Sequence, residues 1–179
     1  MRYSMLGWAG MLAATFACTR AAPPAPTPAS GGVILAADQG ELYHLGQRRS
    51  PTLIKVDPKV AGSKHLFMLS EVLPPGTGVP VHRHTHDEEI LFIHAGTVTV
   101  TLGDRQAEAR AGATVFIPPN TWIGVQNTGS EPATFLAIFP EPSTGDYFRG
   151  IGRSPGDTRP PPTAAEFAEL NRRHHMVYR

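Results

Sequence analysis

The spacing of short apolar runs is the feature that most limits what this chain can fold into. Each run ends at proline, glycine or asparagine after about ten residues, a pattern typical of strands joined by turns. Glycine and proline each occur 18 times among the 179 residues, too often for long helices. The segment 97–102, TVTVTL, alternates threonine with aliphatic residues, and Gly103-Asp104 then suits a tight hairpin turn. We predict further strands at 65–73, 106–111, 114–117, 122–126 and 133–139. The pattern indicates an all-β barrel or sandwich.

The first 17 residues have the pattern of a signal peptide. Arg2 precedes a mostly apolar run from Met5 to Ala17, which is too short to span a bilayer comfortably. Cys18 follows, and the segment resembles a bacterial lipoprotein signal, in which the cysteine becomes the lipidated first residue. We therefore expect an exported protein, periplasmic or membrane-anchored as a lipoprotein of a bacterium, whose only membrane contact is a lipid on Cys18. The alternative is an ordinary cleaved signal with an incidental cysteine.

The remainder divides into three parts. Residues 18–32 are a proline-rich linker that would act as a semi-extended tether. The strand pattern occupies residues 33–145, which we assign to the barrel. Residues 146–179 form a C-terminal extension, where Thr163 and Glu166 match a capping box and predict a short helix. We expect this extension to be a structural clasp across the barrel rather than a lid over its mouth.

Charge and cysteine content exclude several kinds of partner and site. The chain has 16 basic and 15 acidic side chains, so it has no basic excess to bind a nucleic-acid backbone. Cys18 is the only cysteine, which rules out an internal disulfide, a cysteine-rich zinc site and an iron–sulfur cluster held by one chain. Chemistry must then come largely from the eight histidines, three of which fall within the five residues 82–86.

The segment 82–89, HRHTHDEE, has the composition of a metal site. Residues two apart on a strand share a face, so His82 and His84 project together. Glu89 is the first residue of the next apolar run. Because the alternation of faces does not continue through the intervening turn, Glu89 can face the same interior as the two histidines. Two imidazoles and a carboxylate form the facial triad that suits a non-haem divalent metal. Glu88 is the rival carboxylate. Copper, iron, manganese, nickel and zinc are all compatible with these ligands.

A family resemblance reinforces this interpretation. The pattern Gly76-x5-His82-x-His84-x4-Glu89-x6-Gly96 resembles the first cupin motif at every defining position, and 112–127 resembles the second. Together with the flanking strands, the resemblance covers roughly residues 60–140. It implies a double-stranded β-helix, a jelly-roll-like barrel, with the ligands pointing inward near one mouth. It also implies a homodimer.

The second motif departs from the family pattern at two positions. Asn120 replaces the expected glycine, a mild change because asparagine tolerates positive φ. Ile123 stands where the family's third histidine is usual. The chain therefore either has a three-ligand site with extra open positions, or a weak metal site in a barrel that serves as a plain binding pocket.

Further side chains are candidates for the pocket wall and for proton transfer. We expect Trp122 and Ile123, together with Phe92 and Leu91, to supply an apolar wall beside the metal. His86 and Glu88 are candidate proton shuttles, although a solvated turn is the default place for both. His94 has the opposite parity to Glu89 and should point out of the barrel. The remaining histidines match no ligand spacing and are interpreted as structural or exposed: His44, His65, His174 and His175.

Three functions fit these features. The first is a dioxygenase-type oxidoreductase for a small aromatic or phenolic substrate, since the chain resembles quercetin dioxygenase-like cupins. The second is a non-catalytic module that binds a small molecule and has a degenerate metal site. The third is a sugar isomerase or epimerase, which needs a general base that only His86 or Glu88 offers. The fold alone does not decide among them.

Overall fold

The computed structural model describes residues 31–46 and 50–179. The predicted signal peptide (1–17), Cys18 and the linker as far as residue 30 therefore lie outside the described residues. Within the described ranges, no helix is long and apolar enough to cross a membrane.

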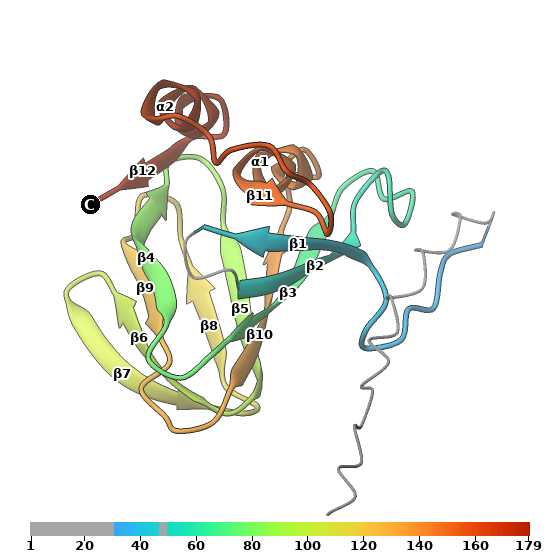
Figure 1. The fold of residues 1–179 in the computed structure, drawn as a ribbon. Helices are drawn as coiled ribbons and strands as arrows, with labels where there is room; N and C mark the ends of the chain where they lie inside the picture. The colour runs from blue at the N-terminus through green and yellow to red at the C-terminus, as the bar shows by residue number, and fades with distance from the viewer. Residues whose placement is uncertain (1–30, 47–49) are drawn as a thin grey trace, which may run out of the picture.

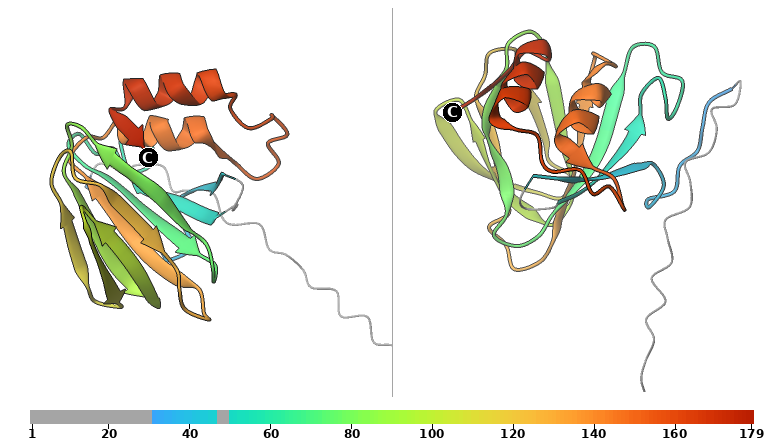
Figure 2. Two further views of the ribbon diagram at one scale, coloured as in Figure 1. Left: turned by 90° about the vertical axis from the view of Figure 1, so that its left-hand side faces the viewer. Right: turned by 45° about the horizontal axis from the view of Figure 1, so that its top comes forward.

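Two antiparallel sheets face each other and form the body of the molecule (Figures 1 and 2). The larger sheet contains, in spatial order, β11 (Gly152–Arg153), β1 (Glu41–Leu45), β2 (Ser50–Val56), β3 (Phe67–Leu73), β10 (Ala133–Phe139), β5 (Glu89–Ala95) and β8 (Thr114–Ile117). The smaller sheet contains β12 (Met176–Tyr178), β4 (Gly78–His84), β9 (Ile123–Gln126), β6 (Thr97–Leu102) and β7 (Arg105–Arg110). The predicted all-β architecture is confirmed.

Alternation of side chains along the strands makes the core. In β3 and β10 every second residue is buried, and the two strands pair from Leu73↔Ala133 to Phe67↔Phe139. In β6 the valines point inward and the threonines outward, and Gly103, at φ 62°, closes the predicted hairpin to β7. Apolar residues at alternate positions thus face the opposite sheet. A polar residue at one of these alternate positions also points into the barrel.

Two positions with positive φ confirm the turn chemistry of the motifs. Gly96 has φ 76°, and a Cβ there would lie 2.8 Å from the Cα of Ala133, so a larger residue has neither the conformation nor the space. Asn120 has φ 62°, as expected for an asparagine in place of glycine.

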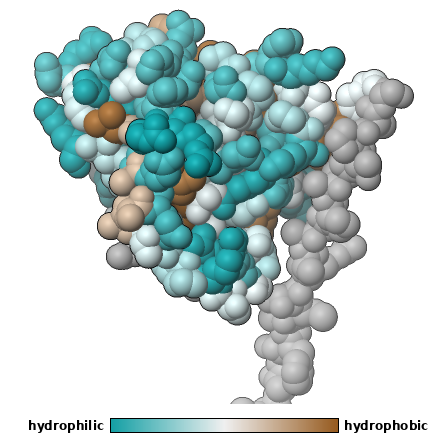
Figure 3. Space-filling view, turned by 90° about the horizontal axis from the view of Figure 1, so that it is seen from above, coloured by the Kyte–Doolittle hydropathy of each residue, from teal (hydrophilic) through white to brown (hydrophobic). Residues whose placement is uncertain are grey.

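The C-terminal extension crosses one end of the barrel. Helices α1 (Thr144–Ile151) and α2 (Ala164–Arg173) lie side by side there (Figure 2), and the predicted capping box of Thr163 is present. The face that carries the helices is mostly hydrophilic, with only small separate hydrophobic patches (Figure 3). Helix α1 was not predicted, and the boundary predicted after residue 145 falls inside it. Strands β11 and β12 were not predicted.

Candidate metal centre

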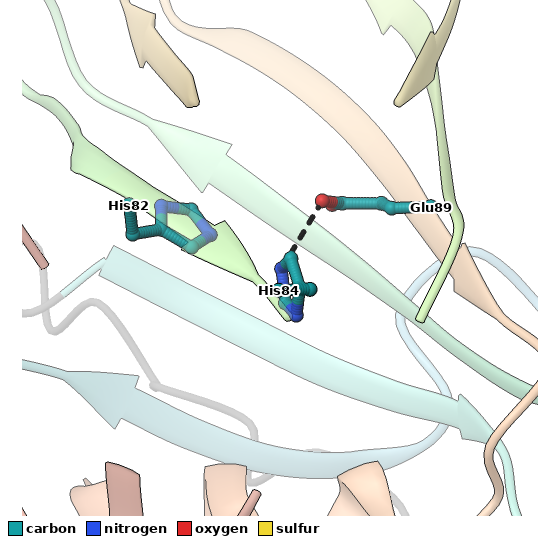
Figure 4. Close-up of side chains that lie close together, drawn as sticks. All are labelled: His82, His84 and Glu89. Carbon is teal, nitrogen blue, oxygen red and sulfur yellow. Dashed lines mark ion pairs between the residues drawn. The ribbon is translucent and has the colours of Figure 1, made fainter. Parts of the chain in front are cut away.

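Three ligand-type side chains meet inside the barrel (Figure 4). His82 and His84 lie on β4, and Glu89 is the first residue of β5. All three are buried, with 6%, 4% and 5% of their surface exposed. One ligand atom from each lies within 4.8 Å of the others, close enough to share one ion. The structure therefore brings together the three residues that the sequence singled out.

The turn between β4 and β5 explains how Glu89 joins the histidines. β4 belongs to the smaller sheet and β5 to the larger one, so the chain changes sheets between them. Glu89 is buried and its neighbour Glu88 is exposed, as strand alternation requires. Glu88 therefore does not compete with Glu89 for the site.

The hydrogen bonds at the centre fit a metal ion. His82 Nδ1 lies 2.8 Å from the carbonyl oxygen of Pro80, which can only accept, so Nδ1 carries the proton and Nε2 keeps its lone pair for a metal. His84 Nε2 and Glu89 Oε2 are 3.3 Å apart, an ion-pair distance, yet neither has a hydrogen-bond partner among the described residues. Buried polar atoms without partners are costly, and a divalent cation between them would remove that cost.

A cavity of about 580 Å³ opens beside the three ligands. Its wall is mainly apolar and includes Leu91, Ile123, Phe139 and Phe148. Ile123 is 1% exposed and pairs with His82 across β4 and β9, so an apolar side chain lies directly beside the ligands. The size and lining are typical of a small-molecule site with a few polar anchors.

The predicted contribution of Trp122 to this wall is corrected by the structure. Ile123 faces the cavity, so Trp122, the preceding residue, does not line it. The Trp122 ring instead contacts two guanidinium groups, whose Cζ atoms lie 4.7 Å (Arg83) and 5.2 Å (Arg179) from the ring centroid. Phe92 is likewise absent from the cavity wall, because its neighbour Leu91 takes the inward position on β5.

The proposed proton shuttles lie away from the main cavity. His86 and Glu88 are exposed, and neither lines it. His86 packs on His175 with ring centroids 4.0 Å apart, and both line a second cavity of about 250 Å³. This cavity shares four lining residues with the first: His84, Tyr147, Phe148 and Met176. His174 lines this second cavity, and burial lowers its pKa although the charge of Asp146 partly offsets the effect. His94 is exposed on β5, as expected.

Several polar residues of the cavity wall were not predicted from the sequence. His44 and Glu71 come from β1 and β3, while Tyr147 and Tyr178 come from α1 and β12. Glu71 is 2% exposed, and the signal for it was a lone charge at an inward position of the strand 65–73. Tyr178 had only the weak signal of the alternating segment Met176-Val177-Tyr178.

Comparison with known proteins identifies the family. Residues 69–139, which contain all three candidate ligands, match the model of the cupin domain. This segment is a cupin domain. The double-stranded β-helix implied by the resemblance is thereby confirmed.

Relatives of this cupin share the barrel rather than the whole chain. Over 65 residues it is 34% identical to an uncharacterized protein of Methanocaldococcus jannaschii. The matched segment covers 36% of this chain and 52% of that protein. Over 76 residues it is 32% identical to mannose-1-phosphate guanylyltransferase 2 of Escherichia coli O157:H7, covering 42% of this chain and 15% of that protein.

Among solved structures, the oxalate decarboxylase of Lactobacillus farciminis in complex with formate is similar, with a TM-score of 0.52 and 25% identity, over 57% of this chain and 31% of that one. This cupin thus spans about half the length of the first relative and less of the other two.

Proposed function

We propose that this cupin binds one divalent metal ion through His82, His84 and Glu89 and uses it in a dioxygenase-type oxidation of a small aromatic or phenolic substrate. The observation that carries the proposal is the convergence of three buried ligand atoms, two of them without hydrogen-bond partners among the described residues, beside a largely apolar cavity. Imidazole and carboxylate accept copper, iron, manganese, nickel and zinc, but the oxidation would need one of the first four, since zinc has no redox chemistry.

Some residues around the site would bind the substrate, and others would orient the metal ligands. Three protein ligands leave coordination positions open, and a bound metal supplies Lewis acidity and, if redox-active, electron transfer. The apolar wall that includes Leu91, Ile123 and Phe139 would hold the ring of the substrate and exclude water. Pro80 would keep His82 in the metal-binding tautomer through its carbonyl oxygen.

A non-catalytic binding module is the second candidate, and Ile123 is the observation that favours it. An isoleucine at this position takes the place of a metal ligand and adds apolar surface. Both changes are expected in a barrel that only binds a small molecule. The sugar isomerase or epimerase is less well supported, because His86 and Glu88, the bases considered for it, do not line the main cavity.

The first test is elemental analysis of the protein purified without a metal-binding tag. We expect about one metal ion per chain, lost in the His82→Ala/His84→Ala double variant. His94→Ala is the matched control, because this histidine is exposed on β5 and should not affect metal content. No bound metal, even after dialysis against each ion, would exclude the oxidoreductase.

A second assay separates the two candidates once metal is bound. Oxygen uptake with catechols and other phenols is expected for the oxidoreductase. Oxalate is tested separately by release of formate, because of the similarity to the Lactobacillus farciminis oxalate decarboxylase and because decarboxylation consumes no oxygen. A ligand-induced rise in melting temperature without turnover is the result expected of a binding module.

We further propose that the chain is exported, anchored through a lipid on Cys18, and assembles as a homodimer with no nucleic-acid partner. The apolar run that precedes Cys18 supports the location, and the near-neutral charge argues against a nucleic-acid partner. The resemblance to cupins supports the dimer. Labelling with a radioactive fatty acid should mark the wild-type chain but not Cys18→Ser. Light scattering should give twice the mass of one chain, and a monomer mass would overturn the dimer.

A further inference from the structure

The last strand of the chain lies directly against the candidate ligands. β12 pairs antiparallel with β4, so that Met176 lies opposite His84 and Tyr178 opposite His82. Backbone hydrogen bonds extend the ladder at both ends, from Thr85 N to the His175 carbonyl at 2.9 Å and from Arg179 N to the Val81 carbonyl at 3.1 Å. Partners across a strand pair have side chains on the same face, so Met176 and Tyr178 point into the cavity with the histidines.

Tyr178 packs flat on the imidazole of His82. The ring centroids are 5.4 Å apart and the planes are inclined by only 25°. The edge of His84 meets His82 at 5.1 Å and an angle of 72°. With its Nδ1 bonded to Pro80, the His82 ring is thus restrained by an edge contact, a face contact and a hydrogen bond. Of these three restraints, only the contact with Tyr178 comes from a residue outside the segment 69–139 that matches the cupin model.

Tyr178 is itself held by both helices of the extension. Its hydroxyl lies 2.9 Å from that of Tyr147 on α1, and the Tyr147 hydroxyl donates to Asn171 Oδ1 on α2 at 3.1 Å. Phe167 of α2 packs against the Tyr178 ring with centroids 5.4 Å apart. Tyr147 is only 1% exposed, so this anchor is rigid. The ring that touches His82 therefore has a fixed position rather than that of a loose chain end.

A site with three protein ligands depends strongly on such support. Ile123 offers no fourth ligand, so an error in the orientation of His82 cannot be compensated by another side chain at that position. Groups that orient a metal-binding histidine change metal affinity without touching the metal.

We propose that β12 is part of the metal centre and that Tyr178 is a positioning residue for His82. This inference rests on the proposed metal function. Because coupling is reciprocal, the strand that strengthens metal binding is in turn held more firmly when metal is bound. The extension thus acts on the metal centre as well as clasping the barrel.

The test compares Co²⁺ binding by the full chain and three variants, with visible absorption as the readout of ligand geometry. Tyr178→Leu keeps an apolar side chain but removes the aromatic face, and its Co²⁺ affinity should fall about 10- to 100-fold with an altered spectrum. Tyr178→Phe restores the ring and should restore both. Val177→Ala is the matched control, because Val177 lies on the same strand but is exposed on its other side.

Hydrogen exchange provides a second measurement that needs no variant. Addition of Co²⁺ to the wild-type chain should slow exchange of the amides of Val177 and Arg179. A folded Tyr178→Leu chain with unchanged Co²⁺ affinity and spectrum, or unchanged exchange in β12 on metal binding, would overturn this inference alone. A folded wild-type chain that takes up no Co²⁺ would overturn the proposed metal function together with it.

Discussion

At the scale of single residues, position 123 decides how many protein ligands the metal centre has. Ile123 pairs with His82 across β4 and β9 and faces the same cavity. We predict that Ile123→His adds a fourth ligand and raises Co²⁺ affinity by at least about tenfold, or 1.4 kcal/mol. Without metal, the same substitution buries an imidazole in an apolar wall and should lower the free energy of unfolding by about 1–3 kcal/mol.

Urea unfolding with and without Co²⁺, together with calorimetric titration, measures both effects of Ile123→His. Ile123→Val is the control for the loss of packing, with an expected cost of about 0.5–1.5 kcal/mol and no change in metal affinity. Equal Co²⁺ affinity in the histidine variant and the wild type would mean that position 123 does not face the metal.

Strand parity explains which site residues were predictable. His82 and His84 share a face because they are two apart, and Glu89 was placed by the turn that precedes it. The same rule shows why Trp122 was placed wrongly: once Ile123 points inward, its neighbour cannot line the same wall. Glu71 and His44 were missed because their strands, β3 and β1, also pair with strands remote in sequence, β10 and β11 respectively.

At the scale of elements, an ion cluster attaches α1 to the larger sheet. The guanidinium of Arg149 lies 2.7 Å from Asp57 Oδ2 and donates to Glu41 Oε2 from Nε at 2.9 Å. The side chains of Arg149 and Asp57 are only 14% and 1% exposed. We predict that Arg149→Met lowers the free energy of unfolding by about 3–5 kcal/mol, because it leaves a buried carboxylate without its counter-ion.

An exposed ion pair between α1 and the loop that follows β2 provides the control for that loss. Lys59 and Asp146 are 2.9 Å apart, but their side chains are 62% and 58% exposed. Lys59→Met should therefore cost no more than about 1 kcal/mol. Urea unfolding of both variants measures the difference, and equal costs would show that α1 is not held by the Arg149 cluster.

The same cluster predicts how stability changes with pH. Burial raises the pKa of Glu41, but hydrogen bonds from Arg149 and Tyr43 outweigh it, so the net pKa lies below the ordinary glutamate value. A carboxyl with a lower pKa in the folded state stabilises the protein fully above its unfolded pKa, and that stability is lost as the pH falls through the folded value. We expect unfolding free energy to drop at acidic pH, less steeply in Glu41→Gln than in wild type. Parallel pH profiles would contradict this role of Glu41.

The unpredicted elements share a physical cause. β11 and β12 contain two and three residues, too few for an alternating pattern to be distinctive. Their positions are set by partners that are remote in sequence, β1 and β4 respectively. The capping box of Thr163 and the hairpin at Gly103 are local, and both were predictable from a few adjacent residues.

At the scale of the whole molecule, the metal ligands come from both sheets. His82 and His84 belong to the five-stranded sheet and Glu89 to the seven-stranded one, so one bound ion would link the two layers across the core (Figure 4). The three ligands lie within eight residues of the sequence, but their side chains converge only when β4 and β5 are in place, so the folded chain should bind the ion more tightly than the unfolded chain. Metal binding should therefore stabilise the entire barrel rather than one strand.

We predict that Co²⁺ at 100 times its dissociation constant raises the free energy of unfolding by about 2.7 kcal/mol. Urea unfolding followed by tryptophan fluorescence and by far-UV circular dichroism measures the gain, and both signals should shift together because the ion joins the two sheets. His82→Ala should abolish the shift, whereas His94→Ala, an exposed histidine on β5, should retain it. A shift that persists in His82→Ala would mean that the ion binds elsewhere. A shift in one signal alone would mean that it does not connect the sheets.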